Sequence, residues 1–72
     1  MSNVYYREVR PSGPAWQKKA EEHAEAGRSF CVRPFNKQLH WAFLSDLCER
    51  HHLAPRFDAR ERTAYFEPQG SS

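Results

Sequence analysis

The segment from Lys37 to His52 is the sequence feature that most restricts the fold of this chain. At about 100° per residue, its large apolar side chains fall on one wide arc and its polar side chains fall opposite. Asn36, directly before the segment, is a preferred helix N-cap. The pattern predicts one long amphipathic helix, which needs an apolar surface to cover it. The members of the arc are Leu39, Phe43, Leu44, Leu47 and Cys48, with Trp41 at its border.

A second, shorter helix is predicted between two strands. Residues 3–9 are rich in β-branched and aromatic side chains and run into a proline-containing stretch, which is typical of a strand. Residues 28–35 alternate, with Phe30 and Val32 on one face, and this second strand is expected to end at Pro34. Residues 14–26 between them carry a narrow apolar stripe, which predicts a helix that lies close to its neighbour. The stripe consists of Trp16, Ala20 and Ala24.

The ends of this shorter helix have their own signals. Pro14 suits a first helical position, where a missing N–H costs nothing. Ser12 or Gly13 is the expected N-cap, and Gly27 is the expected residue in the left-handed region after the helix.

The C-terminal part of the chain is predicted to form a hairpin. Pro55 is expected to end the long helical segment, and residues 56–67 carry two pairs of apolar residues around a polar run. Pairing Phe57 with Phe66 and Ala59 with Ala64 would place all four on one face of a sheet.

These elements predict an α+β fold with the order β-α-β-α-β-β. Two helices packed on one face of a mixed sheet of three or four strands, a two-layer sandwich, would bury both helical stripes. The first two strands are expected to be parallel neighbours. A chain of 72 residues is predicted to form one domain, over residues 1–68, with a disordered tail at 69–72.

The element order, with Pro14 at the start of the first helix, resembles that of the TusA-type sulfur carriers and of the C-terminal domain of bacterial translation initiation factor three. In the sulfur-carrier family a Cys-Pro-x-Pro motif opens the first helix with a reactive thiol. The corresponding stretch here is Pro11-Ser12-Gly13-Pro14, which contains no cysteine. The resemblance therefore implies a fold and no activity.

Charge and cysteine content restrict the classes of partner and of compartment. Eleven Lys and Arg against nine Asp and Glu leave a formal charge of +2, which does not demand a nucleic-acid partner. Two cysteines are too few for a disulfide framework and indicate a reducing compartment. Residues 1–10 lack an apolar leader, and the longest apolar run, 41–44, is far shorter than the roughly 20 residues that span a bilayer. We expect a cytoplasmic protein without membrane contact.

Patterns that support catalysis or metal binding are weak. The glycines are scattered, and no paired carboxylates lie in an apolar setting, so we expect no enzyme. Glu21, Glu22 and Glu25 fall on the polar face of the shorter helix. Cys48, His51 and His52 lie within one helical turn, and Cys48 and His52 have the i, i+4 spacing that can place two ligands on one metal. A structural zinc needs four ligands, so this pair does not make a site. We expect no metal and no cofactor, and we expect both cysteines to be buried sulfurs.

The sheet face turned away from the helices is the main candidate binding surface. Arginine interleaved with tyrosine suits a protein interface. It also suits the stacking of unpaired bases with phosphates held by arginine. A second candidate surface is the Trp41 edge of the long helix with its end at His52. The residues expected on the sheet face are Tyr5, Arg7, Arg33, Arg60, Arg62 and Tyr65.

The sequence thus favours a small non-enzymatic binding module that docks on a larger protein or on its own copy. Small proteins of phages and mobile elements that inhibit host machinery, anti-CRISPR proteins included, are often of this regulator or inhibitor type. The low net charge favours a protein partner. The alternative is a single-stranded nucleic-acid-binding protein that uses the arginine and tyrosine face.

Overall fold

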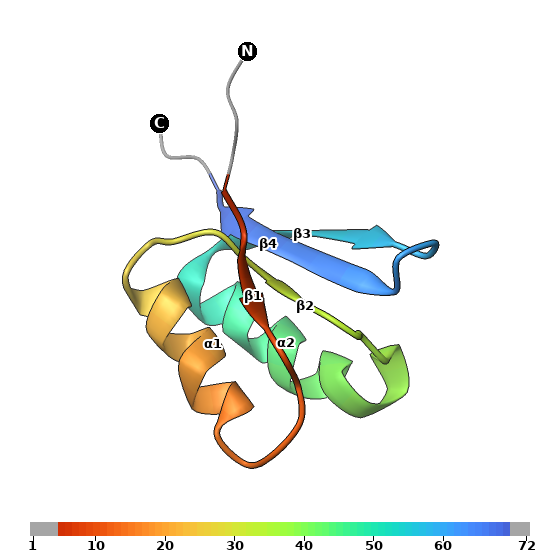
Figure 1. The fold of residues 1–72 in the computed structure, drawn as a ribbon. Helices are drawn as coiled ribbons and strands as arrows, with labels where there is room; N and C mark the ends of the chain where they lie inside the picture. Colours follow the sequence, from red (N-terminus) through yellow and green to blue (C-terminus); the bar gives the residue numbers. More distant parts are fainter. Residues whose placement is uncertain (1–4, 70–72) are drawn as a thin grey trace.

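The computed structural model describes residues 5–69, which form two helices and four strands in the predicted order (Figure 1). The expected first strand and the expected tail extend beyond this range at residues 3–4 and 70–72. The elements are β1 (Arg7–Val9), α1 (Trp16–Glu25), β2 (Phe30–Val32), α2 (Lys37–His51), β3 (Leu53–Asp58) and β4 (Thr63–Pro68).

The four strands form one mixed sheet in the order β1-β2-β4-β3. β1 and β2 are parallel neighbours, as predicted, whereas β4 runs antiparallel to both β2 and β3. Both helices cover the same face of this sheet, and no helix of residues 5–69 covers the opposite face (Figure 1). The predicted two-layer α+β sandwich is therefore confirmed.

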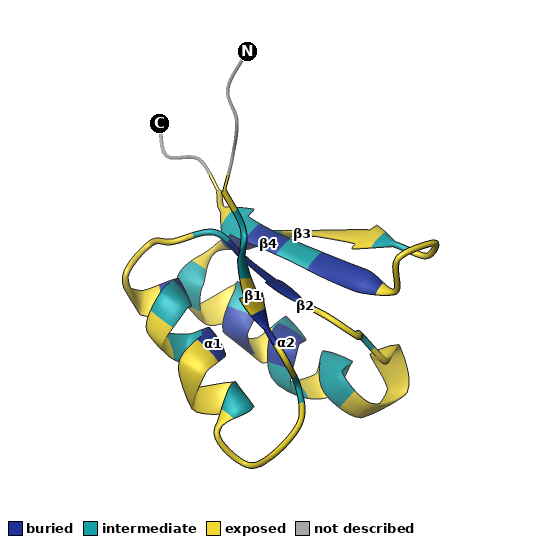
Figure 2. Cartoon of the chain, in the orientation of Figure 1, coloured by how far each residue is buried: buried dark blue, intermediate teal, exposed yellow. Residues whose placement is uncertain are grey.

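The core lies between the sheet and the helices, where buried residues of both layers meet (Figure 2). Phe30 and Phe66 stack at its centre with ring centroids 5.1 Å apart. Ala20 and Ala24 are the buried residues of α1, and their small side chains let this helix lie close to its neighbours, as the stripe predicted. The remaining core residues are Val9, Val32, Leu44, Leu47, Leu53 and Ala64.

The start of α2 follows the sequence signal. Asn36 is its N-cap, and the side-chain Oδ1 accepts hydrogen bonds from the backbone N–H of Gln38 and Leu39 at 2.9 and 3.3 Å. His52 follows the last helical residue in the left-handed region, with φ of 55°. This residue turns the chain directly into β3, so α2 ends at His51, four residues before Pro55, and not at the proline.

The start of α1 differs from the prediction. Its N-cap is Ala15, which makes no side-chain capping bond, so the expected capping by Ser12 or Gly13 is wrong. Gly13 instead has φ of 86° and turns the chain between β1 and α1. Gly27 does take the left-handed conformation predicted after the helix, with φ of 72°.

The hairpin forms, but its predicted register is wrong by two residues. Phe57 lies opposite Ala64, and Phe66 lies opposite Pro55. Asp58 sets this register because its Oδ1 accepts the backbone N–H groups of the second and third following residues, which draws Ala59 into the turn. A shift of two preserves the face of each side chain, so the apolar residues still point toward the helices.

β3 is an edge strand that tolerates a proline. It begins at Leu53 and contains Pro55, whose missing N–H is acceptable at the edge of a sheet. The backbone N–H of Gln69 donates to the carbonyl of His52 at 2.8 Å and extends the pairing beyond β4. Neither helix of residues 5–69 has the length and apolar character needed to cross a membrane.

Candidate functional site

The helix-free face of the sheet is organised around Tyr65 on β4. The guanidinium of Arg56 lies 4.5 Å from the centre of its ring, and the ring of Tyr6 meets it edge to face at 4.9 Å. Its hydroxyl donates to Glu61 at 3.1 Å, and this hydrogen bond raises the pKa of Tyr65. The ring and the hydroxyl of Tyr65 are therefore already engaged inside the protein.

Two residues predicted for this face lie elsewhere. Arg7 pairs with Phe30 in the sheet register and so points to the helix side, which corrects the prediction. The reason is that Val9 is buried, and alternation along the strand then places Arg7 on the same side. Tyr5 lies beside Arg7, whose guanidinium is 5.3 Å from the centre of the Tyr5 ring. Tyr6, one position along, takes the expected place beside Tyr65.

The predicted arginines are only partly brought together. Arg33 and Arg62 line one surface hollow of about 670 Å³, together with Arg10, which the sequence analysis did not single out. Two glutamates, Glu8 and Glu61, line the same hollow. The positive charge there is therefore largely balanced. Arg60, the remaining predicted arginine, is exposed in the β3–β4 turn and is not among the lining residues.

A second surface is built from aromatic side chains at the N-terminal ends of the helices. Six rings follow one another in contact, with neighbouring centroids between 5.2 and 6.1 Å apart. They come from both helices, from β3 and from the segment after β2. We call this set the aromatic belt. Its members, in order of contact, are Phe43, Trp16, His40, Phe35, Phe57 and Trp41.

The belt is incompletely covered. Phe57 is 50% exposed, and the other five members are partly buried. Leu39, one helical turn before Phe43 on the same flank of α2, is 73% exposed, although the apolar arc had predicted it in the core. The apolar arc of α2 is wider than the surface that covers it, so Leu39 stays exposed.

Within the belt, His40 has a structural role. Its Nδ1 accepts the backbone N–H of Asn36 at 3.0 Å, and burial lowers its pKa below the ordinary value. A neutral imidazole in this place holds the start of α2 and separates two aromatic neighbours, Trp16 and Phe35.

Of the six belt residues, only Trp41 was predicted as a site residue. Trp16 and Phe43 were expected in the apolar faces of the two helices, and Phe35, Phe57 and His40 were not predicted for a binding surface. Phe35 and Phe57 share one sequence signal. Both are large aromatic residues close to a point where the chain is expected to turn, Phe35 after Pro34 and Phe57 near the hairpin turn. Only the packing of β3 beside α2 shows that they meet.

The thiols are not arranged as nucleophiles. Cys31 on β2 and Cys48 on α2 are largely covered, and burial raises the pKa of both. The pKa of Cys48 is raised to about 11. Both groups are therefore protonated near neutral pH and are weak nucleophiles and weak metal ligands.

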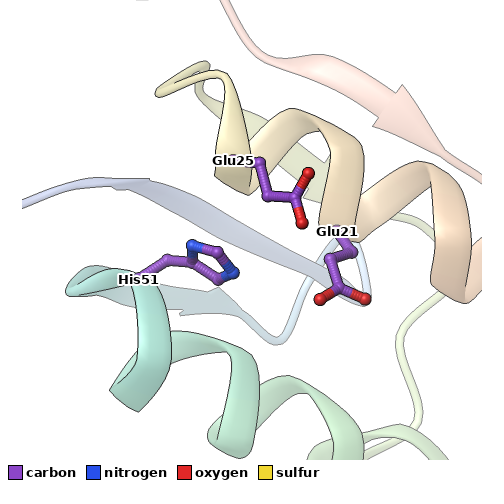
Figure 3. A group of neighbouring side chains, drawn as sticks. All are labelled: Glu21, Glu25 and His51. Carbon is purple, nitrogen blue, oxygen red and sulfur yellow. The ribbon is translucent and has the colours of Figure 1, made fainter.

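The residues at the end of α2 separate into two environments. His52 is exposed in its left-handed position, so the i, i+4 pair that it would make with Cys48 on one helix is not formed. His51 instead extends toward α1, where Glu21 and Glu25 extend toward it (Figure 3). One ligand atom from each of these three residues lies within 4.8 Å of the others.

Comparison with known proteins identified no relative of this chain. No protein-family model matches the chain, and neither a curated protein nor a solved structure was found to be similar to it. The functional argument therefore depends on the fold and on the surfaces described above.

Proposed function

We propose that this protein is a non-enzymatic binding module of the regulator or inhibitor type, which docks on a larger protein through the aromatic belt. The observation that carries the proposal is the half-exposed ring of Phe57 within a continuous row of aromatic rings. Leu39, one helical turn before the end ring Phe43, is exposed as well. Aromatic residues are enriched in the cores of protein interfaces and among the residues that dominate binding energy.

Covering the exposed part of Phe57 would by itself contribute substantially to the free energy of binding. Covering the half of its surface that faces solvent removes about 100 Å² of apolar area from water. At about 25 cal/mol per Å², this corresponds to about 2.5 kcal/mol before the costs of association. One such residue is of the size that makes a binding hot spot.

The belt is also held in place before binding. Phe57 stacks on Phe35 at 5.4 Å and meets Trp41 edge to face at 5.3 Å. Side chains that are already packed lose little conformational entropy when a partner covers them. The exposed ring is therefore better prepared for binding than a side chain on a flexible loop.

The helix-free sheet face supports the nucleic-acid alternative less well. A base that stacked on Tyr65 would have to displace Arg56 from the ring, and Arg56 is the cation that would otherwise hold the phosphate. The hollow with Arg33 and Arg62 also holds two glutamates. For these reasons we favour a protein partner over single-stranded nucleic acid.

Site-specific photo-cross-linking tests the proposal. Phe57→benzoylphenylalanine places the reactive group on the belt, and Glu22→benzoylphenylalanine places it at an exposed position of α1 as a control. In cells that produce the protein, the belt variant is expected to capture one protein species, identified by mass spectrometry, that the control variant does not capture.

Three results would overturn the proposal. Capture of the same proteins by both variants would show non-specific contact. Capture of a second copy of this chain would show a homodimer in place of a larger partner. Capture of nucleic acid at the belt would place the protein in the alternative class.

A further inference from the structure

The cluster of Glu21, Glu25 and His51 lies away from the aromatic belt, between the C-terminal halves of the two helices. Trp16 of α1 contacts His40 and Phe43 of α2, while Glu21, further along α1, is paired with Arg50 near the end of α2. The two helices therefore run side by side in the same direction, and the cluster occupies the end opposite the belt.

The imidazole of His51 points to a ligand at this place. Its Nε2 is buried and has no hydrogen-bond partner among residues 5–69. A buried polar atom without a partner is rare in folded proteins, because it loses its bonds to water and gains none in return. Figure 3 shows the ring directed from α2 toward the space into which the carboxylates of Glu21 and Glu25 project from α1.

The two glutamates come from successive turns of one helix. Glu21 and Glu25 are four residues apart, a spacing that places two side chains on the same face of α1. His51 supplies the third donor from the neighbouring helix. The three donor atoms already lie within 4.8 Å of one another. Ligands of a tetrahedral zinc are about 3.4 Å apart, so small rotations of flexible glutamate side chains close the difference.

Neighbouring side chains hold one of the donors in position. Arg50 donates from Nη1 to Oε2 of Glu21 at 2.9 Å and from Nε to Asp46 at 2.7 Å. The bond from Arg50 engages Oε2 only, so it does not occupy Oε1 of Glu21. Residues that hydrogen-bond to a metal-ligating carboxylate orient it in this way in many metal sites.

We propose that Glu21, Glu25 and His51 form a divalent-cation site that bridges α1 and α2 and is best suited to Zn²⁺. Two carboxylates and one imidazole are a ligand set for a first-row transition metal, and an all-oxygen set would be needed to favour Mg²⁺ or Ca²⁺. Three protein ligands leave one position of a tetrahedral zinc to water. The covered, protonated thiol of Cys48 is not part of the set.

Isothermal titration of metal-free protein with ZnCl₂ tests the site. The wild-type chain is expected to bind one equivalent, and Glu25→Gln and His51→Asn are each expected to weaken binding by at least about tenfold. Thermal unfolding gives an independent readout. Because the ion joins two helices of the folded state only, zinc in large excess should raise the Tm of the wild type by about 5–10 °C and leave that of the His51→Asn variant unchanged.

Matched controls distinguish this cluster from its neighbours. Glu22→Gln removes the same charge from α1, and His52→Asn removes the adjacent imidazole, and neither should change the affinity. Replacement of zinc by Co²⁺ should give a visible spectrum without a thiolate-to-cobalt charge-transfer band. Circular dichroism of each variant verifies that it is folded.

The proposal fails if the folded wild-type protein takes up less than one equivalent of zinc. It also fails if zinc binding survives Glu25→Gln, or if a thiolate band shows that Cys48 is the ligand. A loss of binding in His52→Asn that equals the loss in His51→Asn would likewise overturn it, because the metal would then sit at the end of α2 alone.

Discussion

At the scale of single residues, two leucines of α2 show how position on a helix determines the contribution of a side chain. Leu44 is fully buried between the helices and the sheet, whereas Leu39, five residues earlier, is 73% exposed. The amphipathic pattern placed both residues in one arc. It could not separate them, because the width of the surface that covers α2 depends on β3, which comes later in the chain.

The same substitution at these two positions is therefore predicted to have unequal effects. Leu44→Ala should lower the free energy of unfolding by about 3 kcal/mol, because it removes buried methyl groups and leaves a cavity. Leu39→Ala should change it by less than about 0.5 kcal/mol. Urea denaturation of both variants measures the difference, and equal losses would contradict the position assigned to Leu39.

His23 is predicted to make the stability pH-dependent. Its Nδ1 is buried without a partner among residues 5–69, and its ring stacks on Phe30 at 5.9 Å. Burial, followed by the charge of Arg28, lowers the pKa of His23 below 6.5. The neutral ring is favoured in the folded state, so the unfolded chain takes up the proton first as the pH falls.

The free energy of unfolding should accordingly be unaffected by His23 above about pH 6.5 and should decrease below it. His23→Gln should reduce the slope between pH 7 and pH 5, measured by urea denaturation at each pH. A slope that His23→Gln does not alter would show that protonation of this residue is not coupled to folding.

At the scale of elements, the helices were more predictable than the strands. The start of α2 is encoded within four residues, since Asn36 both ends the preceding loop and caps the helix. The strand ends depend on partners distant in sequence, and β1 and β2 are three residues each, shorter than their β-rich segments. The hairpin register depends on the side chain of Asp58, which alternation of apolar residues cannot reveal.

The cap of α2 gives a test at this scale. Asn36→Ala removes an acceptor for two backbone N–H groups and should lower the free energy of unfolding by about 1 kcal/mol. Asn36→Asp retains the acceptor and should restore most of the loss. Thermal denaturation followed by circular dichroism measures both, and an aspartate variant as unstable as the alanine variant would contradict the capping role.

At the scale of the whole molecule, the strand order decides which surfaces exist. β3 lies at the sheet edge beside β4, and this brings Phe57 against Trp41 and Phe35. No local pattern encodes that meeting, so the sequence predicted only Trp41. The helix-free face was easier to predict, because alternation of side chains along β2 and β4 is local. The prediction was wrong at β1, where the alternation is shifted by one residue. Tyr6 therefore lies on this face in place of Tyr5 and Arg7.

The docking role of the aromatic belt is tested most directly by the affinity of the protein for its cross-linked partner. Phe57→Ser and Tyr65→Ser remove an aromatic ring from opposite faces of the same hairpin, and circular dichroism verifies that each variant is folded. Titration calorimetry should show at least a tenfold weaker complex for Phe57→Ser, about 1.4 kcal/mol, and an unchanged one for Tyr65→Ser. An unchanged affinity in Phe57→Ser with a loss in Tyr65→Ser would place the interface on the helix-free sheet face and contradict the proposed function.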